Sequence, residues 1–161
     1  EGRPLDDHPV VPMERHFSAR LDTTRLRDRE QIRRNIDQAA EQVLDARSRG
    51  RFEGTDGELW PGRRSGHIPG SRNLPYTELL DPENGTLLPP EALRERFAAA
   101  GIDPARPVVT SCGSGVTACA LLLGLTRVGA KDLALYDGSW AEWGRPGDTP
   151  VATGPSDAEK R

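Results

Sequence analysis

A strand, a tight loop and a helix start follow one another in the stretch Val108-Val109-Thr110-Ser111-Cys112-Gly113-Ser114-Gly115-Val116-Thr117-Ala118. The β-branched residues favour a strand, and the two glycines let the backbone turn closely around the thiol. Backbone N–H groups in such a loop converge on one point, and the N-terminus of the following helix adds partial positive charge. A lone cysteine is more often a small buried residue, but a Gly-Ser-Gly turn serves an anion cradle better than a core. The stretch therefore predicts a nucleophilic Cys112 that carries a negatively charged intermediate.

Length and composition limit the function classes. The 161 residues are enough for one domain with a hydrophobic core. The net charge of −3 and the mixture of acidic and basic residues give no indication of nucleic-acid binding. No apolar run approaches the roughly 20 residues that span a bilayer, so we expect no membrane segment. No group of cysteines and histidines has zinc spacing, so we expect no metal and no cofactor.

The two cysteines, Cys112 and Cys119, are seven residues apart. On a helix this spacing separates them by roughly 10 Å, which is too far for a disulfide. We therefore expect a reducing, cytoplasmic setting. Cys119 falls within an apolar helical run and is expected in the core.

Strand and helix patterns alternate along the chain. Asp28 and Gln31 have the spacing of a capping box at a helix start. The sequence further predicts strands at 42–45, 107–110 and 133–136, a mostly irregular stretch at 47–71, an edge strand or turn at 73–75, and helices at 89–100 and 116–128. This alternation predicts an α/β fold with a mainly parallel central sheet flanked by helices. Because ligands bind beyond the carboxyl ends of such strands, we expect Asp45, Cys112 and Asp137 to be neighbours.

The ends of the chain are rich in proline and charge. Residues 1–20 are expected to be an interdomain linker, residues 21–145 the catalytic domain and residues 146–161 a flexible C-terminal tail. A chain that begins in a linker and lacks an initiator methionine is expected to be a piece of a longer protein.

Four motifs in order resemble the rhodanese family of sulfurtransferases. They are Val43-Leu44-Asp45-Ala46-Arg47, Gly66-His67-Ile68-Pro69-Gly70, the loop from Cys112 to Thr117, and Asp137-Gly138-Ser139-Trp140-Ala141-Glu142-Trp143. The resemblance runs from about residue 16 to about residue 145 and implies a rhodanese-like domain. The loop looks like the 3-mercaptopyruvate type, because thiosulfate-using relatives usually carry basic residues where this chain has Gly113 and Ser114. The resemblance also implies that this is the C-terminal catalytic domain of a tandem-domain enzyme, whose N-terminal rhodanese-like domain is missing here.

The resemblance implies a role for each loop residue. Cys112 takes a sulfur atom from a small-molecule donor as a persulfide and passes it to a thiol, thioredoxin or cyanide. Ser114 assists proton transfer together with a histidine and an aspartate from the other domain. The persulfide is held by the loop amides, with substrate-binding positions at Gly113, Gly115, Val116 and Thr117.

Arg51 matches a family arginine that binds the substrate carboxylate. Trp60 stands where a second carboxylate-binding arginine is expected, and Arg63 and Arg64 follow it closely. Either of these two arginines could take that place from a rearranged loop, so they are also candidate substrate ligands. Loss of a bidentate contact would weaken binding by about 1.5–3 kcal/mol, which puts 3-mercaptopyruvate specificity in question.

Alternative functions remain at this stage. The chain could use thiosulfate as its donor, or it could be a non-catalytic binding module or sulfur carrier. A cysteine phosphatase is disfavoured because Ala118 stands where its phosphate-binding arginine would be. His67, Asp45 and Arg47 are expected to have mainly structural roles, and we expect Trp140 and Trp143 to pack against the sheet.

Overall fold

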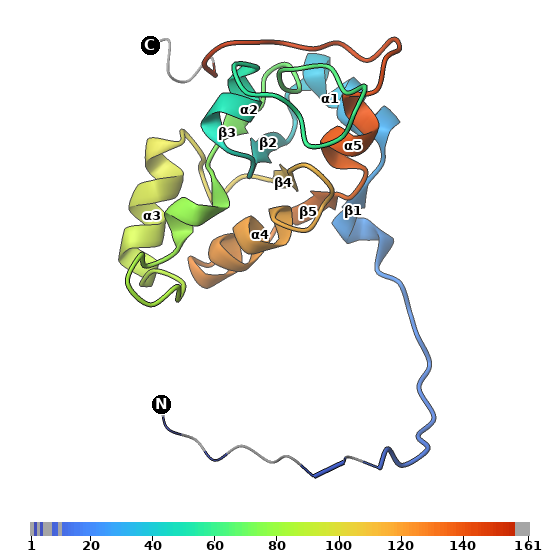
Figure 1. Cartoon of the computed structure of the whole chain (residues 1–161), viewed down its shortest axis with the longest axis vertical. Coiled ribbons are helices and arrows are strands. Elements are labelled where there is room, and N and C mark those ends of the chain that lie inside the picture. The colour runs from blue at the N-terminus through green and yellow to red at the C-terminus, as the bar shows by residue number, and fades with distance from the viewer. Residues whose placement is uncertain (1, 3, 5–7, 10, 157–161) are drawn as a thin grey trace.

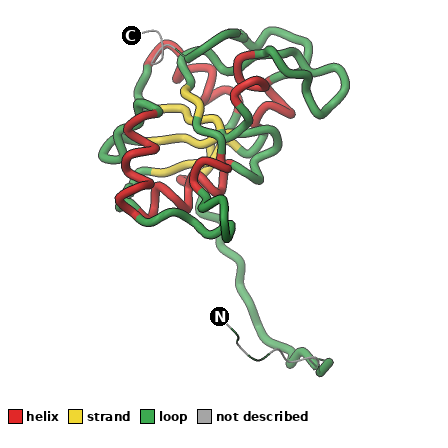
Figure 2. Tube along the Cα trace, turned by 60° about the vertical axis from the view of Figure 1, so that its left-hand side comes forward, coloured by secondary structure: helices red, strands yellow, loops and turns green. Residues whose placement is uncertain are grey.

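A parallel five-stranded sheet runs through the centre of the protein (Figures 1 and 2). The structure is a computed structural model that describes residues 2, 4, 8, 9 and 11–156. The strand order is β1-β5-β4-β2-β3, with all pairings parallel. The strands are β1 (Leu26–Arg27), β2 (Gln42–Asp45), β3 (Arg72–Asn73), β4 (Val108–Ser111) and β5 (Leu133–Tyr136). The sequence-based prediction of an α/β fold with a parallel sheet is confirmed.

Helices cover both faces of this sheet. They are α1 (Arg29–Gln38), α2 (Arg49–Glu53), α3 (Pro90–Ala99), α4 (Ala118–Arg127) and α5 (Ser139–Trp143), with 3-10 turns at Thr23–Arg25 and Tyr76–Leu79. Successive strand residues point to opposite faces, so Val108 joins a core beneath α3 and α4, whereas Val109 joins a core with α1 and α5. Trp140 and Trp143 are buried in the second core, as expected.

The start of α1 forms as its sequence predicts. The Gln31 backbone N–H donates to the Asp28 carboxylate at 2.7 Å, and the Asp28 N–H donates to the Gln31 side chain at 2.8 Å. This reciprocal capping box satisfies two of the N–H groups that every helix start leaves unpaired. The edge position expected at 73–75 is also confirmed, because β3 is an outer strand.

Two local predictions were incomplete or wrong. The stretch expected to be mostly loop contains α2, which ends at Gly54 with a φ of +83°. The helix expected at 116–128 begins only at Ala118 and is half exposed rather than buried. Its inner face carries Leu121 and Leu125, and Cys119 lies on the outer side, exposed. Cys119 is therefore not a core residue. A helix turns by about 100° per residue, so Cys119 lies on roughly the opposite side from Leu121.

The segment expected to be a flexible tail packs on the domain over its described part. The indole Nε1 of Trp143 donates to the carbonyl of Pro150 at 2.8 Å. Ala152 and His67 exchange backbone hydrogen bonds, and Ser156 is buried. These long-range partners hold 146–156 in place, and residues 157–161 lie outside the described residues.

The described residues from 11 to 22 form neither helix nor strand, and they extend away from the domain (Figure 1). Within the described ranges, no helix combines the length and apolar character needed to cross a bilayer. The linker role of 1–20 stays a prediction.

Candidate active site

Cys112 lies directly after β4, where the chain leaves the carboxyl edge of the sheet. Its residue surface is only 1% exposed. The Cys112 carbonyl accepts a hydrogen bond from the Trp140 N–H at 2.9 Å, and the Gly113 carbonyl accepts one from the Ala141 N–H at 2.8 Å. Helix α5 therefore holds the first two carbonyl groups of the loop.

The backbone N–H groups of the loop have no hydrogen-bond acceptor in the part of the chain that the structure describes. Among residues 11–156, no group accepts a hydrogen bond from the backbone N–H of residues 113–117. A run of backbone donors next to a thiol, none of them paired with a described group, is available to an external anion. Together with the N-terminus of α4, these amides form a cradle suited to an anion on Cys112. The cradle comprises the amides of Gly113, Ser114, Gly115, Val116 and Thr117.

Gly115 makes the tight turn of this cradle. Its φ is +85°, and a β-carbon there would lie 2.8 Å from Asp137 Oδ1 and 3.0 Å from the Asp137 carbonyl oxygen. Asp137 therefore lies beside the loop, as expected from its place at the end of β5. Ser114 and Val116 point their side chains to solvent, with Val116 73% exposed.

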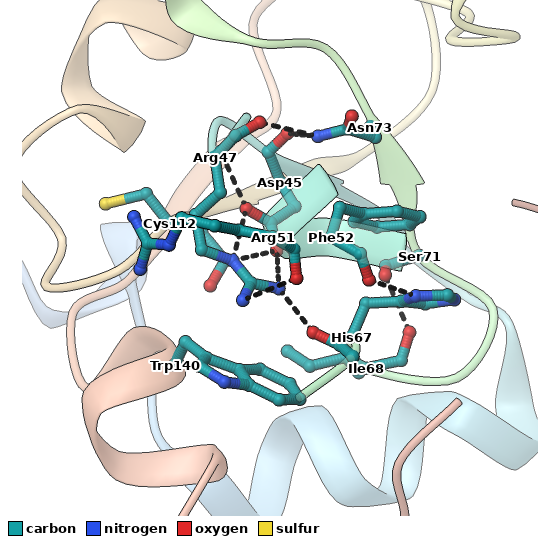
Figure 3. Close-up of polar contacts among 12 residues, drawn as sticks. Asp45, Arg47, Arg51, Phe52, His67, Ile68, Ser71, Asn73, Cys112 and Trp140 are labelled. Carbon is teal, nitrogen blue, oxygen red and sulfur yellow. Dashed lines mark hydrogen bonds and ion pairs between the residues drawn. The ribbon is translucent and has the colours of Figure 1, made fainter. Parts of the chain in front are cut away.

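Asp45 lies at the same sheet edge but belongs to a buried ion-pair network (Figure 3). Arg47 donates to both oxygens of Asp45, at distances from 2.7 to 3.2 Å. Its Nη1 donates to Glu58 at 2.7 Å, and its guanidinium carbon lies 4.4 Å from the centre of the Trp140 ring. The structural role expected for Asp45 and Arg47 is consistent with this geometry. Glu58, which shares the network, lies in none of the four motifs.

Arg51 extends this network toward the loop. Its Nη2 donates to Glu58 at 2.7 Å. A β-carbon on Gly113 would lie 3.3 Å from the same nitrogen, so the guanidinium rests against the cradle. The Arg51 Nε is buried and has no partner. Arg51 is thus the cation that the structure brings to the loop.

The expected position of the second arginine and the residues just after it are Trp60, Arg63 and Arg64. Each of the three contacts a different part of the domain. The Trp60 indole lies against Gly113, where a β-carbon would be 2.9 Å from two of its ring carbons. Arg63 Nε donates to the Ala141 carbonyl at 2.8 Å. Arg64 donates to the Thr149 carbonyl and hydroxyl and to the Trp143 carbonyl. These hydrogen bonds tie Arg64 to the C-terminal segment, while its Nε is buried and has no partner. The role of Arg64 as a substrate ligand stays a prediction.

His67 supports the loop that precedes β3. Its ring stacks on Phe52 with centroids 3.8 Å apart, and Nδ1 hydrogen-bonds with the Phe52 carbonyl at 2.8 Å (Figure 3). The ring is buried, which fits the structural role expected from the sequence rather than a general base.

Ser139 supports the start of the loop through its side-chain hydroxyl. It has a φ of +48°, uncommon for a residue with a side chain. Its hydroxyl donates to the Tyr136 carbonyl at 2.8 Å and accepts the Cys112 N–H at 3.2 Å. Its place after Asp137-Gly138 was visible in the sequence, but the backbone conformation was not.

A hollow of about 540 Å³ opens where α1 meets the start of β2, and the Arg27–Glu41 ion pair lines it. Over the described part of the chain, no group of His, Cys, Asp or Glu side chains could hold a metal ion.

Comparison with known proteins identifies the fold family. The rhodanese-like domain family matches residues 28–146. The chain belongs to this family. The expectation drawn from the four motifs is thus confirmed at the level of the family.

Two curated relatives of this rhodanese-like domain show how much of a longer protein it spans. It is 47% identical over 122 residues to the Arabidopsis thaliana protein named thiosulfate/3-mercaptopyruvate sulfurtransferase 1, mitochondrial, covering 76% of this chain and 32% of the relative. It is 46% identical over 127 residues to the Mus musculus 3-mercaptopyruvate sulfurtransferase, covering 79% of this chain and 42% of the relative. The chain therefore spans less than half the length of these relatives.

Solved structures agree on the fold. The Tum1 protein from Saccharomyces cerevisiae superposes with a TM-score of 0.73 at 36% identity, over 81% of this chain and 47% of that one. The 3-mercaptopyruvate sulfotransferase SseA from Escherichia coli superposes with a TM-score of 0.66 at 34% identity, over 78% of this chain and 45% of that one.

Proposed function

We propose that this rhodanese-like domain is a sulfurtransferase that moves a sulfane sulfur through a persulfide on Cys112. The observation that carries the proposal is the run of free loop amides around a buried thiol. A sulfur compound in free solution gains little from such a cradle. A persulfide anion on Cys112, by contrast, lies within reach of several backbone N–H groups at once. The names of the curated relatives support the same reaction class.

The reaction has two balanced steps with 3-mercaptopyruvate as the favoured donor. The Cys112 thiolate attacks the donor sulfur, the carbon–sulfur bond breaks, and its electron pair leaves as the enolate of pyruvate, which takes up a proton. A thiol, thioredoxin or cyanide then attacks the outer sulfur, the sulfur–sulfur bond breaks, and the Cys112 thiolate is restored. In this scheme Arg51 binds the donor carboxylate, and the exposed Ser114 is placed to exchange protons with groups outside this chain.

The setting of the domain is part of the proposal. We infer a second rhodanese-like domain that contributes to the site, because the chain covers less than half of its relatives and the cradle side chains Ser114 and Val116 face solvent. We infer a reducing compartment, with the cytoplasm as our choice, because Cys112 and Cys119 are both free. The word mitochondrial in the name of one relative makes that compartment the competing location.

Thiosulfate is the second donor considered. Against it stands the charge around the loop, since Gly113 and Ser114 bring no cation and Arg51 is already paired with Glu58. The Arg51 guanidinium that a dianion would meet is partly neutralised by Glu58.

The proposal is tested by the intact mass of the chain after brief exposure to 3-mercaptopyruvate, and separately to thiosulfate. We expect the mass of one added sulfur atom with 3-mercaptopyruvate. The gain should vanish in Cys112→Ser and persist in Cys119→Ser, the matched control for an exposed thiol. A gain that survives in Cys112→Ser, or no gain from either donor, would contradict sulfur transfer at Cys112 by this chain.

A further inference from the structure

The Trp60 side chain covers one side of the cradle. Two carbons of its six-membered ring approach Gly113 so closely that a β-carbon there would lie 2.9 Å from each. The Arg51 guanidinium carbon is 5.9 Å from the indole centre, so ring and cation lie side by side against the same glycine. A ligand held by the loop amides therefore has an aromatic surface next to the Arg51 cation.

The charged groups near the loop set the charge of a suitable ligand. Arg51 contributes one positive charge, which Glu58 partly offsets at 2.7 Å. Asp137 adds a carboxylate beside the loop, against Gly115. Because Glu58 is shared with Arg47, Arg51 keeps part of its positive charge, and with Asp137 nearby this charge favours a ligand with a single negative charge over a compact dianion.

We propose that Trp60 determines specificity at this site, by selecting sulfur compounds that carry one negative charge and a planar apolar body. The inference rests on the proposed function for its sulfur chemistry and names the substrate class of that site. The planar body stacks on or packs edge-on against the indole while the anionic end meets Arg51 and the loop amides.

An aryl thiosulfonate represents this class and reacts in a balanced step. The Cys112 thiolate attacks the outer sulfur, the sulfur–sulfur bond breaks, and the electron pair leaves with an aryl sulfinate. Two negative charges enter the step, and two leave it as a persulfide anion and a sulfinate. No oxidant or reductant is needed.

The test compares two probes that share charge and reacting group but differ in the aromatic ring. Persulfide formation is measured as kcat/KM with benzenethiosulfonate and methanethiosulfonate, using cyanide as acceptor. We expect the unmodified chain to prefer the aryl donor by about two- to tenfold, the range for an aromatic pair. Trp60→Ala should abolish the preference, and Trp60→Phe should restore most of it. Leu59→Ala, at an apolar side chain 72% exposed next to Trp60, should leave it unchanged.

A binding measurement separates this inference from the proposed function. Calorimetry on the Cys112→Ser chain compares the affinities of benzenesulfinate and methanesulfinate, which need no turnover. If no sulfur donor adds a sulfur atom to Cys112, but the tighter binding of benzenesulfinate depends on Trp60, the proposed function fails and the inference on specificity holds. The inference would be overturned if the preference for benzenesulfinate over methanesulfinate were the same with Trp60 and with Trp60→Ala. Trp60→Arg provides the reverse test, because a second cation should raise the relative use of thiosulfate.

Discussion

Replacing Arg47 with methionine should destabilise the domain strongly, because its guanidinium neutralises two buried carboxylates. The Arg47 side chain is 1% exposed, and those of Asp45 and Glu58 are each 3% exposed. Breaking a buried pair by removing one partner typically costs about 3–5 kcal/mol. Each carboxylate keeps one hydrogen bond here, Asp45 from the backbone N–H of residue 47 and Glu58 from Arg51. We therefore expect a loss near the lower limit, about 3 kcal/mol.

Urea unfolding followed by circular dichroism measures this loss as a change in the free energy of unfolding. Arg33→Met is the matched control, because Arg33 also pairs with an aspartate, Asp148, but their side chains are 43% and 75% exposed. The control should unfold at the same urea concentration as the unmodified chain. Equal effects of the two substitutions, or a loss below about 1 kcal/mol for Arg47→Met, would refute the argument that burial sets the cost.

Three further predictions concern the loop, the C-terminal segment and alkaline stability. Gly115→Ala should abolish persulfide formation in the mass assay, because its φ is +85° and a β-carbon would meet a carboxylate oxygen at 2.8 Å, whereas Gly129→Ala, at a φ of +95° in open space, should retain it. Arg64→Ala should speed amide hydrogen exchange at Ala152, because it removes hydrogen bonds that hold residues 146–156; unchanged exchange would argue for independent docking. Burial, with a hydrogen bond to a carboxylate, raises the pKa of the Tyr136 hydroxyl above the ordinary value of 10.0, so its contribution to stability is complete below pH 10 and is lost as the pH rises further. Tyr136→Phe should therefore lessen the fall in the unfolding midpoint above pH 10, and an identical fall would contradict this assignment.

Local signals explain which parts of the fold could be predicted. The capping box at Asp28 and Gln31 involves groups three residues apart, so the sequence contains the whole interaction. Strand β5 was predicted with the bounds it has, because a short apolar run lies between polar residues. The approach of Asp137 to the loop that follows Cys112 was predicted from the parallel sheet, since the carboxyl ends of its strands share one edge.

Long-range contacts explain what could not be predicted. Proline and glycine made 146–156 look flexible, but Arg64 and Trp143 use carbonyl groups of that segment as acceptors. Counting along the loop placed Trp60 at the expected arginine position. Only the structure shows that its ring rests on Gly113, while Arg63 turns to a carbonyl of α5.

The order of the strands has a consequence for how the chain matures during synthesis. Strand β1 is an edge strand whose neighbour is β5. Leu26 therefore cannot take its place in the sheet until Leu135 has been synthesised. The loop that follows β4 leaves the ribosome before α5, whose amides at Trp140 and Ala141 hold its carbonyls. Contacts this distant in sequence form late and slowly. A nascent chain thus carries the Cys112 thiol for some time before its cradle is assembled, and in that interval the thiol is open to oxidation and to premature encounters with sulfur compounds.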